Sequence, residues 1–381
     1  MRIVHCCLSC FYIDGYTYQE NMLVREHVAA GHEVQVVAST ESFNTVGEIV
    51  YLEPAKYIGQ DGAPVIRLPY RKWLPHGLMS KLRLHPGVYQ LLTEFKPEVI
   101  VFHGPCGAEL LTAARYVKYN SNVKLFVDSH EDFNNSARSW LSKALLYKCF
   151  YIPIIHAARR YVEKFLYITY ETKRFCKTLY GLSDSELEFF PLGGVVLNDA
   201  EYGHKRNLVR DRLGVTEKQT LFFQSGKFDE KKKLLESLQA FSKLNCNNSR
   251  LVLAGSFSSS IQAEAKRLIE SDSRITFLGW ANSEQLLELL CAADVYVQPG
   301  SQSATLQMSI AARCAVIIDD VPSHRDIFSD NGFLVTDKEQ LADAMQAFVE
   351  NNDLLITMSL KSSEFANEKL NYAILAARLI K

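Results

Sequence analysis

Short apolar runs alternate with amphipathic stretches along most of the sequence. Near residue 300, the apolar runs Val295–Val297 and Ala315–Ile318 flank a loop of Gly, Pro, Ser and Gln, followed by Leu306 and Ile310 at helical spacing. This order predicts strand, loop, helix and strand, the repeating unit of a parallel α/β sheet. Ligands of such sheets bind where strand ends meet helix N-termini, so the loop is a candidate anion site. A crossover without a ligand is an equally good interpretation.

The first half of the sequence begins with a similar unit. Met1–Phe11 is strand-like and leads into a loop centred on Gly15. Tyr18–Ala30 is then predicted to be a helix that Gly31 closes, and Glu33–Ala38 (EVQVVA) the next strand. The loop after the first strand lacks the GxGxxG fingerprint, so the sequence does not support a dinucleotide site in this half.

Two further strands of the first half each end beside a histidine. Glu98–His103 and Val123–Asp128 are apolar runs, and His130 follows the second of them. A single histidine is more often structural, but a position at the end of a strand favours a role in ligand binding or catalysis. His130 and His103 are therefore both candidate functional residues.

A second series of strands and helices is expected after residue 205. Pro191–Gly194 breaks the pattern, and the polar stretch Asn198–Lys205 is predicted to be an interdomain linker. Gln219–Gln224 then reads as a strand, Ser225–Gly226 as a turn and Lys227–Lys233 as a basic loop. The remaining elements expected are strands at 250–254 and 275–278 and helices at 234–244, 261–271, 283–292 and 372–380.

Length and composition narrow the class of protein. A chain of 381 residues suits two domains, and 48% apolar with 22% charged residues is typical of a soluble globular protein. The net charge of −1 gives no reason to expect nucleic acid as a partner. No run is apolar enough to span a membrane, and the N-terminal residues do not resemble a signal peptide. The cysteines at 6, 7 and 10 lack a second ligand pair, so we expect reduced thiols in a cytoplasmic protein and no metal.

Two stretches of the first half combine basic and aromatic residues. Tyr70–His85 carries four Lys or Arg, no acid and Trp73, and 136–180 carries nine Lys or Arg against two acids. This composition suits an anionic membrane surface or a negatively charged acceptor. Solvent-exposed helix faces and loops would explain it equally well.

Taken in order, several motifs resemble those of the retaining family 4 glycosyltransferases, along nearly the whole chain. SGKFDEKKKLLESLQAF (225–241) is similar to the family's G-R-x-x-x-x-K-G segment, with Gly226, Lys227 and Lys232 at its Gly, Arg and Lys. The other matching stretches, in the family's order, are AGHEVQVV (30–37), GLSDSELEFFPLGG (181–194), LVLAGSF (251–257), FLGW (277–280), AADVYVQPG (292–300) and VPSHRDIFSDNGFLV (321–335).

The resemblance implies the α/β GT-B architecture, in which two Rossmann-like, doubly wound parallel-sheet domains face a cleft. The expected domains are 1–195, which binds the acceptor, and 196–364, which binds a nucleotide-sugar donor. A C-terminal helix at 365–381 would pack back on the first domain. The implied activity is transfer of a hexose from a UDP- or GDP-linked donor to a glycan acceptor, including a lipid-linked one, in lipopolysaccharide or capsule synthesis. No cofactor is implied, because the nucleotide-sugar is a substrate, and the expected location is the cytoplasm or the inner face of the membrane.

The resemblance also implies site residues. His130 would face the transferring sugar and help to stabilise the developing oxocarbenium ion, while the departing phosphate accepts the acceptor's proton. Acceptor contacts are implied at Tyr16, His103, Glu131 and Asp132. Donor contacts are implied at Gly15, Gly226, Lys227, Lys232, Phe277, Ser303, Ala304, Thr305, Leu306 and Gln307.

Two departures from the family pattern leave alternatives open. The family usually carries a Glu, seven residues and a second Glu around the donor loop, but here the loop is shorter and the first Glu has no clear counterpart. The second Glu, which holds the ribose hydroxyls, falls on Met308, which cannot accept those hydrogen bonds. Either Gln307 or a backbone group takes its place, or donor binding is weakened. Lys227 replaces an Arg and keeps the charge, but it loses the bidentate fork. A non-catalytic GT-B protein that binds a glycan or a partner enzyme is therefore one alternative, and a sugar-nucleotide epimerase is another.

Overall fold

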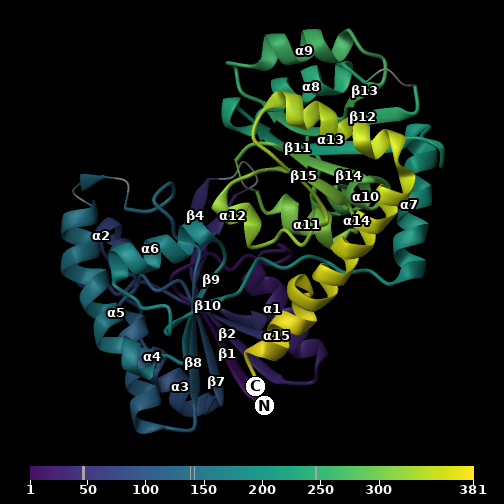
Figure 1. The fold of residues 1–381 in the computed structure, drawn as a ribbon. Coiled ribbons are helices and arrows are strands. Elements are labelled where there is room, and N and C mark those ends of the chain that lie inside the picture. Colours follow the sequence, from purple (N-terminus) through teal and green to yellow (C-terminus); the bar gives the residue numbers. More distant parts are fainter. Residues whose placement is uncertain (45–47, 138, 141, 245–246, 302) are drawn as a thin grey trace. The chain divides into compact units, whose positions relative to one another are not determined.

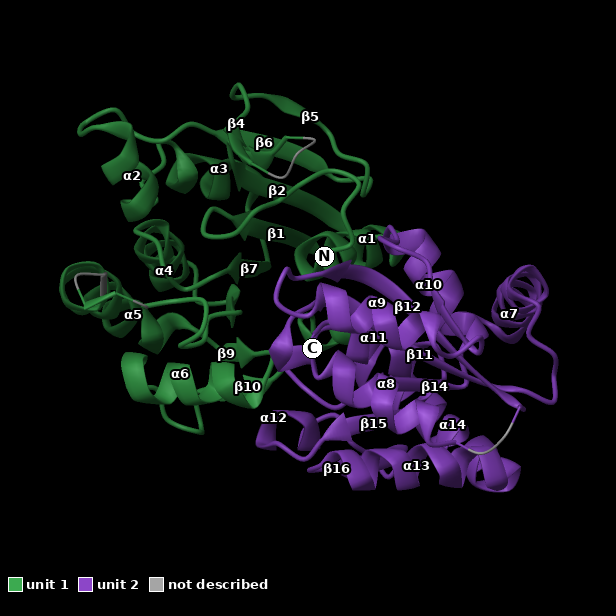
Figure 2. Cartoon of the chain, turned by 90° about the horizontal axis from the view of Figure 1, so that it is seen from above, with its two compact units in different colours: residues 1–191, 375–381 green, residues 192–374 purple. Residues whose placement is uncertain are grey.

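The computed structural model describes residues 1–44, 48–137, 139–140, 142–244, 247–301 and 303–381. The chain divides into two compact units, one of residues 1–191 and 375–381 and the other of residues 192–374 (Figure 2). The sequence placed the boundary after residue 195 and the returning helix at 365–381. In the structure the division falls after Pro191, and only the residues from Leu375 onward belong to the first unit.

Unit 1 is built on an eight-stranded sheet with the order β10-β9-β8-β7-β1-β2-β6-β5 (Figure 1). All its strands are parallel except β5, which pairs antiparallel with β6. The strands are β1 (Arg2–Cys7), β2 (Glu33–Ser39), β5 (Lys56–Ile58), β6 (Pro64–Leu68), β7 (Val99–His103), β8 (Lys124–Ser129), β9 (Lys164–Tyr167) and β10 (Leu187–Phe189), and a separate hairpin joins β3 (Glu41–Phe43) to β4 (Ile49–Tyr51).

Helices cover both faces of this sheet, which is why its central strands are buried and mostly apolar. Figure 1 shows α1 and α15 on one face and α3, α4 and α5 on the other. The helices are α1 (Gln19–Ala29), α2 (His76–Leu82), α3 (Val88–Phe95), α4 (Glu109–Tyr119), a π-helical segment (Ser142–Tyr151), α5 (Ile152–Ala158), a 3-10 turn (Arg159–Tyr161), α6 (Tyr170–Tyr180) and the end of α15 (Tyr372–Arg378). As predicted, α1 ends beside Gly31, whose φ is 78°.

Unit 2 contains a six-stranded, fully parallel sheet with the order β13-β12-β11-β14-β15-β16. Its strands are β11 (Thr220–Phe228), β12 (Ser249–Phe257), β13 (Ile275–Phe277), β14 (Val295–Gln298), β15 (Ala315–Asp319) and β16 (Gly332–Val335). Its helices are α7 (Asp199–Leu213), a 3-10 turn (Glu230–Lys232), α8 (Leu234–Ser242), α9 (Gln262–Glu270), α10 (Ser283–Ala292), α11 (Thr305–Ala311), α12 (Pro322–Arg325), α13 (Lys338–Glu350), α14 (Asn352–Phe365) and a π-helical segment (Ala366–Leu370).

The expectation of two doubly wound parallel sheets is confirmed, and each sheet reverses its strand order once. In unit 1 the chain adds β2 on one side of β1 and β7 on the other. In unit 2 it adds β12 on one side of β11 and β14 on the other. At such a reversal the connections leave in opposite directions and open a crevice at the carboxyl ends of the two strands. These two reversals are therefore where ligand sites are expected.

The predicted linker at 198–205 is wrong, because most of it belongs to α7. Asn198 caps this helix by accepting a hydrogen bond from the amide of Glu201 at 2.9 Å. Further along, the Arg206 and Arg210 guanidinium groups pair with the Asp294 carboxylate at 2.5 and 3.0 Å. Within the stretch itself, the Asp199 carboxylate pairs with Arg313 at 2.7 Å and the Lys205 ammonium group lies 3.8 Å from the Glu288 carboxylate. Its polar side chains therefore belong to a helix that makes ion pairs, not to a flexible connection.

The predicted turn at Ser225–Gly226 is also wrong, since β11 continues through it to Phe228. Gly226 pairs with Gly255 of β12, and both have positive φ, at 144° and 150°. A Cβ atom on Gly255 would lie 1.8 Å from the Gly226 carbonyl oxygen. These glycines permit a close approach of the two backbones. As a result, β11 and β12 stay paired as far as Phe228 and Phe257, at the carboxyl edge of the sheet.

Two expectations from composition can be compared with the structure. In the described part of the chain, no helix is long and apolar enough to cross a membrane. Cys6 and Cys7 are buried on β1, and Cys10 is partly buried just beyond it.

The Gly226–Gly255 contact predicts the effect of one substitution. We expect Gly255→Ala to lower the free energy of unfolding by about 3 kcal/mol, because the new methyl group overlaps a backbone carbonyl. Chemical denaturation measures the change. The control is Gly203→Ala in α7, where a Cβ meets nothing within 4 Å. That variant should be unchanged or more stable by about 0.5–1 kcal/mol, so equal stability of the two variants would contradict the packing described.

Candidate functional site

In unit 2 the strand reversal brings together two loops, one after β11 and one after β14. The Ser301 amide donates to the Lys231 carbonyl at 2.8 Å, and the Lys232 ammonium group donates to the Ser301 carbonyl at 2.8 Å. Gly300 lies so close that a Cβ would stand 2.1 Å from the Lys231 carbonyl oxygen. The two loops are therefore held in a fixed arrangement by backbone contacts that only glycine allows.

The lysines of the first loop have different surroundings. Lys227 is exposed at the end of β11, one strand position from Gly226. Lys232 is partly buried, and its burial lowers the pKa of its ammonium group, while the charge of Asp229 opposes this. Asp229 also caps the 3-10 turn by accepting from the Lys232 amide at 3.2 Å. The predicted basic loop thus presents two cations at the carboxyl edge of the sheet.

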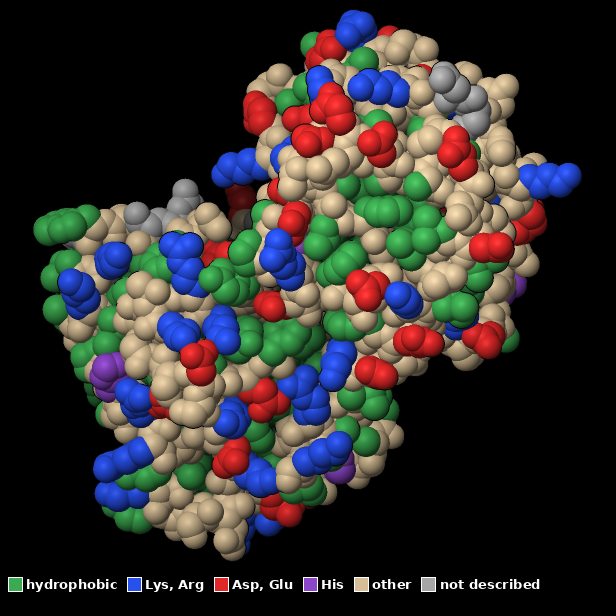
Figure 3. Space-filling view, viewed as in Figure 1, with side chains coloured by type: hydrophobic (Ala, Val, Ile, Leu, Met, Phe, Trp, Pro, Cys, Tyr) green, Lys and Arg blue, Asp and Glu red, His purple; other side chains and the backbone are tan. Residues whose placement is uncertain are grey.

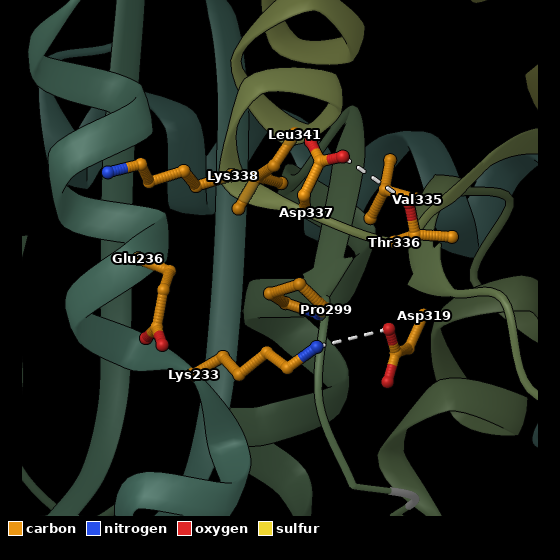
Figure 4. Close-up of a pocket in the computed structure, with 9 residues that line it drawn as sticks. All are labelled: Lys233, Glu236, Pro299, Asp319, Val335, Thr336, Asp337, Lys338 and Leu341. Carbon is orange, nitrogen blue, oxygen red and sulfur yellow. Dashed lines mark hydrogen bonds and ion pairs between the residues drawn. The ribbon is translucent and has the colours of Figure 1, made fainter.

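Lys233 is committed elsewhere, as Figure 4 shows. Its ammonium group lies 3.1 Å from the Asp319 carboxylate at the end of β15. The hollow between them holds about 210 Å³ and also reaches Asp337 and Lys338 at the start of α13. Ligand pockets are usually larger, at about 300–1,000 Å³, so this hollow is too small for a nucleotide-sugar.

The start of α11 forms the other side of the crevice, and the structure modifies the expectation for it. The Ser303 hydroxyl donates to the buried Gln298 side-chain oxygen at 2.6 Å, which fixes the loop before the helix. The amide of Leu306 already donates to the Ser303 carbonyl at 3.1 Å, so it is not free for an anion. Ala304 is exposed and Thr305 is partly buried, and their amides stay candidates for donor contact.

Gln307 and Met308 are oriented differently on α11. Gln307 is only 2% exposed, and its side-chain oxygen has no hydrogen-bond partner among the described residues. Met308, at the position of the family's Glu, is partly exposed. The predicted substitution of Gln307 for that Glu would therefore require its buried side chain to turn outward.

Aromatic side chains lie at the carboxyl ends of β11, β12 and β13. The ring of Phe277 on β13 packs on that of Phe257 on β12 at 4.4 Å between centroids, and Phe257 packs on Phe228 at 5.8 Å. Phe277 is thus partly buried within a row of rings. Just beyond it, Trp280 is 66% exposed, and the sequence analysis did not select it. Its place in FLGW after a strand was the only available signal.

In unit 1 the loop after β1 is braced by its neighbours. Gly15, with a φ of 78°, makes a turn in which a Cβ would lie 2.7 Å from the Gln60 side-chain oxygen. Before it, the Asp14 carboxylate accepts a hydrogen bond from the Tyr57 hydroxyl at 2.6 Å. Tyr16 is partly exposed, and its ring packs edge-on against Tyr18 at 5.2 Å. The loop therefore presents Gly15 and Tyr16 on an ordered turn.

The two candidate histidines of unit 1 meet at one carboxylate. His103 and Asp128 are register partners on β7 and β8, with His103 Nδ1 2.5 Å from Asp128 Oδ2. His130 Nε2 lies 3.8 Å from the same oxygen, and its side chain is 38% exposed. Burial lowers the pKa of His130, but the hydrogen-bonding and charge effects of Asp128 outweigh it and raise the pKa overall. His130 can thus reach a ligand while Asp128 orients it.

His103 does not have the geometry of an acceptor contact. It is 1% exposed, and its two ring nitrogens face His5 and Asp128 at 3.0 and 2.5 Å. A side chain without a free nitrogen cannot bind an acceptor hydroxyl directly. The sequence identified the strand end correctly but could not show that the ring turns into the core.

A groove of about 820 Å³ lies at the carboxyl ends of β1, β7 and β8. Glu131 lines it and accepts hydrogen bonds from the hydroxyls of Tyr180 and, at 3.4 Å, Tyr147. Asp132, by contrast, accepts from two amides of its own turn, those of Asn134 and Asn135, at 2.7 and 2.9 Å. Phe11 and Tyr51, which the sequence analysis did not select, also line the groove. Lys81 and Arg83 of the basic stretch Tyr70–His85 line it too, as does Tyr151 of the stretch 136–180.

Two family models match the chain on either side of the unit boundary. The model "Glycosyl transferase 4-like domain" matches residues 15–193, and "Glycosyl transferases group 1" matches residues 205–364. Comparison with curated protein sequences returned no match.

Solved structures of the same fold match over nearly the full length. HepE of Anabaena, in complex with UDP, is 13% identical with a TM-score of 0.67, and the match covers 100% of this chain and 98% of that one. Sucrose-phosphate synthase from Thermosynechococcus elongatus is 14% identical with a TM-score of 0.64, covering 99% and 96%. WaaG, a glycosyltransferase involved in lipopolysaccharide biosynthesis, is 17% identical with a TM-score of 0.59, covering 99% and 98%. At these identities the likeness establishes the fold. Together with the two family models, it shows that the chain belongs to the GT-B, family 4-like glycosyltransferases.

Proposed function

We propose that the protein is a retaining glycosyltransferase that moves a sugar from a UDP- or GDP-linked donor to a glycan acceptor. The observation that carries this proposal is the locked pair of loops at the β11–β14 reversal, with Lys227 and Lys232 beside the start of α11. A nucleotide-sugar must release a diphosphate, and fixed cations lower the barrier by stabilising the charge that develops on it. The structure of HepE with UDP supports a nucleotide in this kind of fold.

Each part of the proposed donor site has a distinct task. Lys227 and Lys232 would contact the diphosphate, with the amides of Ala304 and Thr305 adding donors beside them. The base would lie toward the aromatic row, where the exposed ring of Trp280 offers a stacking surface. Lys232 is already oriented by the Ser301 carbonyl, so little side-chain entropy would be lost on binding.

The groove of unit 1 would hold the acceptor, and His130 would contact the transferring sugar. Glu131, Tyr51 and Tyr151 supply carboxylate and aromatic surfaces, which suit the hydroxyls and the apolar faces of a sugar ring. No side-chain base is assigned, because in a retaining reaction of this family the departing phosphate would accept the acceptor's proton. The role of Glu131 is then to bind hydroxyl groups.

We further propose a lipid-linked acceptor and a membrane-surface location, in lipopolysaccharide or capsule synthesis. Trp73, just before α2, is 70% exposed with the Arg71 guanidinium over its ring at 4.6 Å, and Trp140 is 78% exposed. Trp140 directly follows Ser139, which lines the groove, and Trp73 precedes α2, whose Ser80 and Lys81 also line it. Figure 3 shows Lys and Arg side chains interleaved with apolar ones on this unit. Exposed tryptophans among cations suit an anionic membrane interface.

A catalytically weak or inactive protein that binds a glycan or a partner enzyme is a second candidate. Met308 stands where the family has the Glu that holds the ribose, and Gln307 beside it is buried. Without either contact, donor affinity would depend on the diphosphate and the base alone. The protein could therefore bind a nucleotide through these contacts and still transfer sugar slowly or not at all.

Nucleotide binding tests the donor site. We expect UDP or GDP at millimolar concentration to raise the unfolding temperature of the protein, because a ligand that binds only the folded state stabilises it. Lys232→Ala should weaken that binding roughly tenfold or more, through loss of a charge-assisted contact to the diphosphate. Calorimetric titration of both proteins gives the two dissociation constants.

Lys231→Ala is the matched control, because Lys231 is an exposed neighbour that contributes its carbonyl to the loop contact. It should bind like the unchanged protein. No shift with UDP, GDP or ADP would refute the donor site and favour the non-catalytic candidate. Equal losses in both lysine variants would refute the specific role of Lys232.

Vesicle binding tests the membrane surface. We expect the protein to sediment with vesicles containing anionic phosphatidylglycerol, more weakly at high salt, and not with phosphatidylcholine alone. Trp73→Ala combined with Trp140→Ala should abolish sedimentation. Trp280→Ala removes another highly exposed tryptophan, from unit 2, and serves as the control, which should sediment normally. Equal binding by both variants would contradict this surface.

A further inference from the structure

A continuous chain of buried polar groups runs through the core of unit 1 and ends at the candidate catalytic histidine. Each link from Ala376 to Asp128 is a short contact between groups on two different elements, and His130 follows directly after the last of these strands. The members, in order, are the Ala376 carbonyl on α15, His27 on α1, His5 on β1, His103 on β7 and Asp128 on β8, with His130 beyond it. His5 and His27 were not selected from the sequence.

The spacing is that of hydrogen bonds along the entire inner part. His27 Nε2 lies 3.0 Å from the Ala376 carbonyl oxygen, and His27 Nδ1 lies 3.0 Å from His5 Nε2. His5 Nδ1 in turn lies 3.0 Å from His103 Nε2, and the two rings are nearly parallel at 12°. Each of the three histidines is at most 1% exposed. Water is therefore excluded, and each nitrogen depends on its partner in the chain.

The carbonyl at one end determines where every proton lies. A carbonyl oxygen only accepts, so His27 Nε2 must carry a proton and donate it. If His27 is neutral, its Nδ1 accepts from His5 Nε2, and His5 Nδ1 is then free to accept from His103 Nε2. His103 must also share a proton with Asp128 through Nδ1. With Asp128 ionised, His103 carries protons on both nitrogens and is an imidazolium ion.

The electrostatics agree with this assignment. Burial strongly lowers the pKa of His5, and burial lowers the pKa of His27 to about 4, so both rings are neutral. Burial also opposes the charge on His103, but Asp128 outweighs it and raises the pKa of His103 to about 10. The pKa of Asp128 is lowered by His103 and His130 against the effect of burial. Other groups near these rings are Cys7 on β1, and Glu20 and His32 on and after α1.

We propose that this chain of hydrogen-bonded groups is a positioning device that holds His103 as a buried cation. Asp128 can then orient His130 without its full negative charge acting on the His130 ring. His103 offsets the charge of Asp128, and the Gly104 amide, which donates to Asp128 Oδ1 at 3.0 Å, fixes the carboxylate. The proposal deepens the proposed function, because it rests on His130 contacting the transferring sugar.

Through this chain of hydrogen-bonded groups, the C-terminal helix α15 contributes to the position of His130. Ala376 belongs to α15 and is the acceptor at which the order of protons begins. Without that carbonyl, His27 could donate in the opposite direction, and His103 would lose its fixed acceptor. His5, His27 and His103 are therefore positioning residues, and none of them is expected to touch substrate.

Histidine nitrogen NMR tests the assignment directly, without any donor or acceptor. In protein labelled with ¹⁵N-histidine, we expect His103 to show two protonated ring nitrogens from about pH 6 to about pH 9, consistent with a pKa near 10. His5 and His27 should each show a single proton, on Nε2, over the same range. A singly protonated His103 at neutral pH would overturn the proposal.

Substitution of His5 tests whether the chain acts on His130. His5→Phe keeps a flat ring and removes the acceptor for His103, so His103 should lose its second proton at lower pH. Asp128 then acts uncompensated, and the titration midpoint of His130 should rise by about one pH unit. His5→Asn retains an oxygen near the Nδ1 position and should return both midpoints toward those of the unchanged protein. An unchanged His130 midpoint in a folded His5→Phe variant would overturn the proposal.

The outcomes separate this proposal from the proposed function. If His5→Phe does not fold, the protonation of His103 in the unchanged protein and in His5→Asn decides the question. A doubly protonated His103 with no sugar transfer from any nucleotide-sugar would refute the proposed function and leave the positioning device in place. Sugar transfer by a protein whose His103 is singly protonated would support the proposed function and refute the positioning device.

Discussion

The reversal of strand order beside one central strand is the constraint on which both candidate sites depend. All strands of the unit 2 sheet are parallel, and all but one in unit 1, so their loops emerge at a common edge. At β1–β7 and at β11–β14 the connections diverge, and the edge is left open to a ligand. The structure then fills each opening with different chemistry. Unit 2 has lysines and helix-start amides, whereas unit 1 has a partly exposed histidine beside a wide groove.

The two openings are kept in place by different physical means. In unit 2, backbone atoms approach so closely that only glycine fits at positions 255 and 300, so steric contacts hold the loops in place. In unit 1, polar groups in the core must satisfy one another, since an unpaired buried donor or acceptor costs about 1–3 kcal/mol. His5 and His27 meet that requirement for His103, and the result is a fixed carboxylate next to His130. Packing and proton placement are thus two ways of making a site rigid before a ligand arrives.

The sequence predicted the fold where one local signal dominated. Apolar runs located β1, β7, β8 and β14, and Gly31 marked the end of α1. The prediction failed where tertiary contacts override local preference. Ser225–Gly226 looks like a turn but continues β11, because Gly226 is used for close packing against β12. The polar surface of α7 concealed a helix, and edge strands of three or four residues such as β10 and β16 carry too little pattern to be recognised. For the site, residue order identified the lysine loop and His130, but His5 and His103 are 98 residues apart, and nothing in the sequence shows that their rings meet.

The most direct test of the account is a crystal structure of the protein with a nucleoside diphosphate bound. We expect the diphosphate at the β11–β14 reversal, within contact of the Lys227 and Lys232 side chains and beside the start of α11. Density for the nucleotide at the hollow lined by Lys233 and Asp319, or at the amino ends of the strands, would contradict the claim that the reversal of strand order defines the donor site.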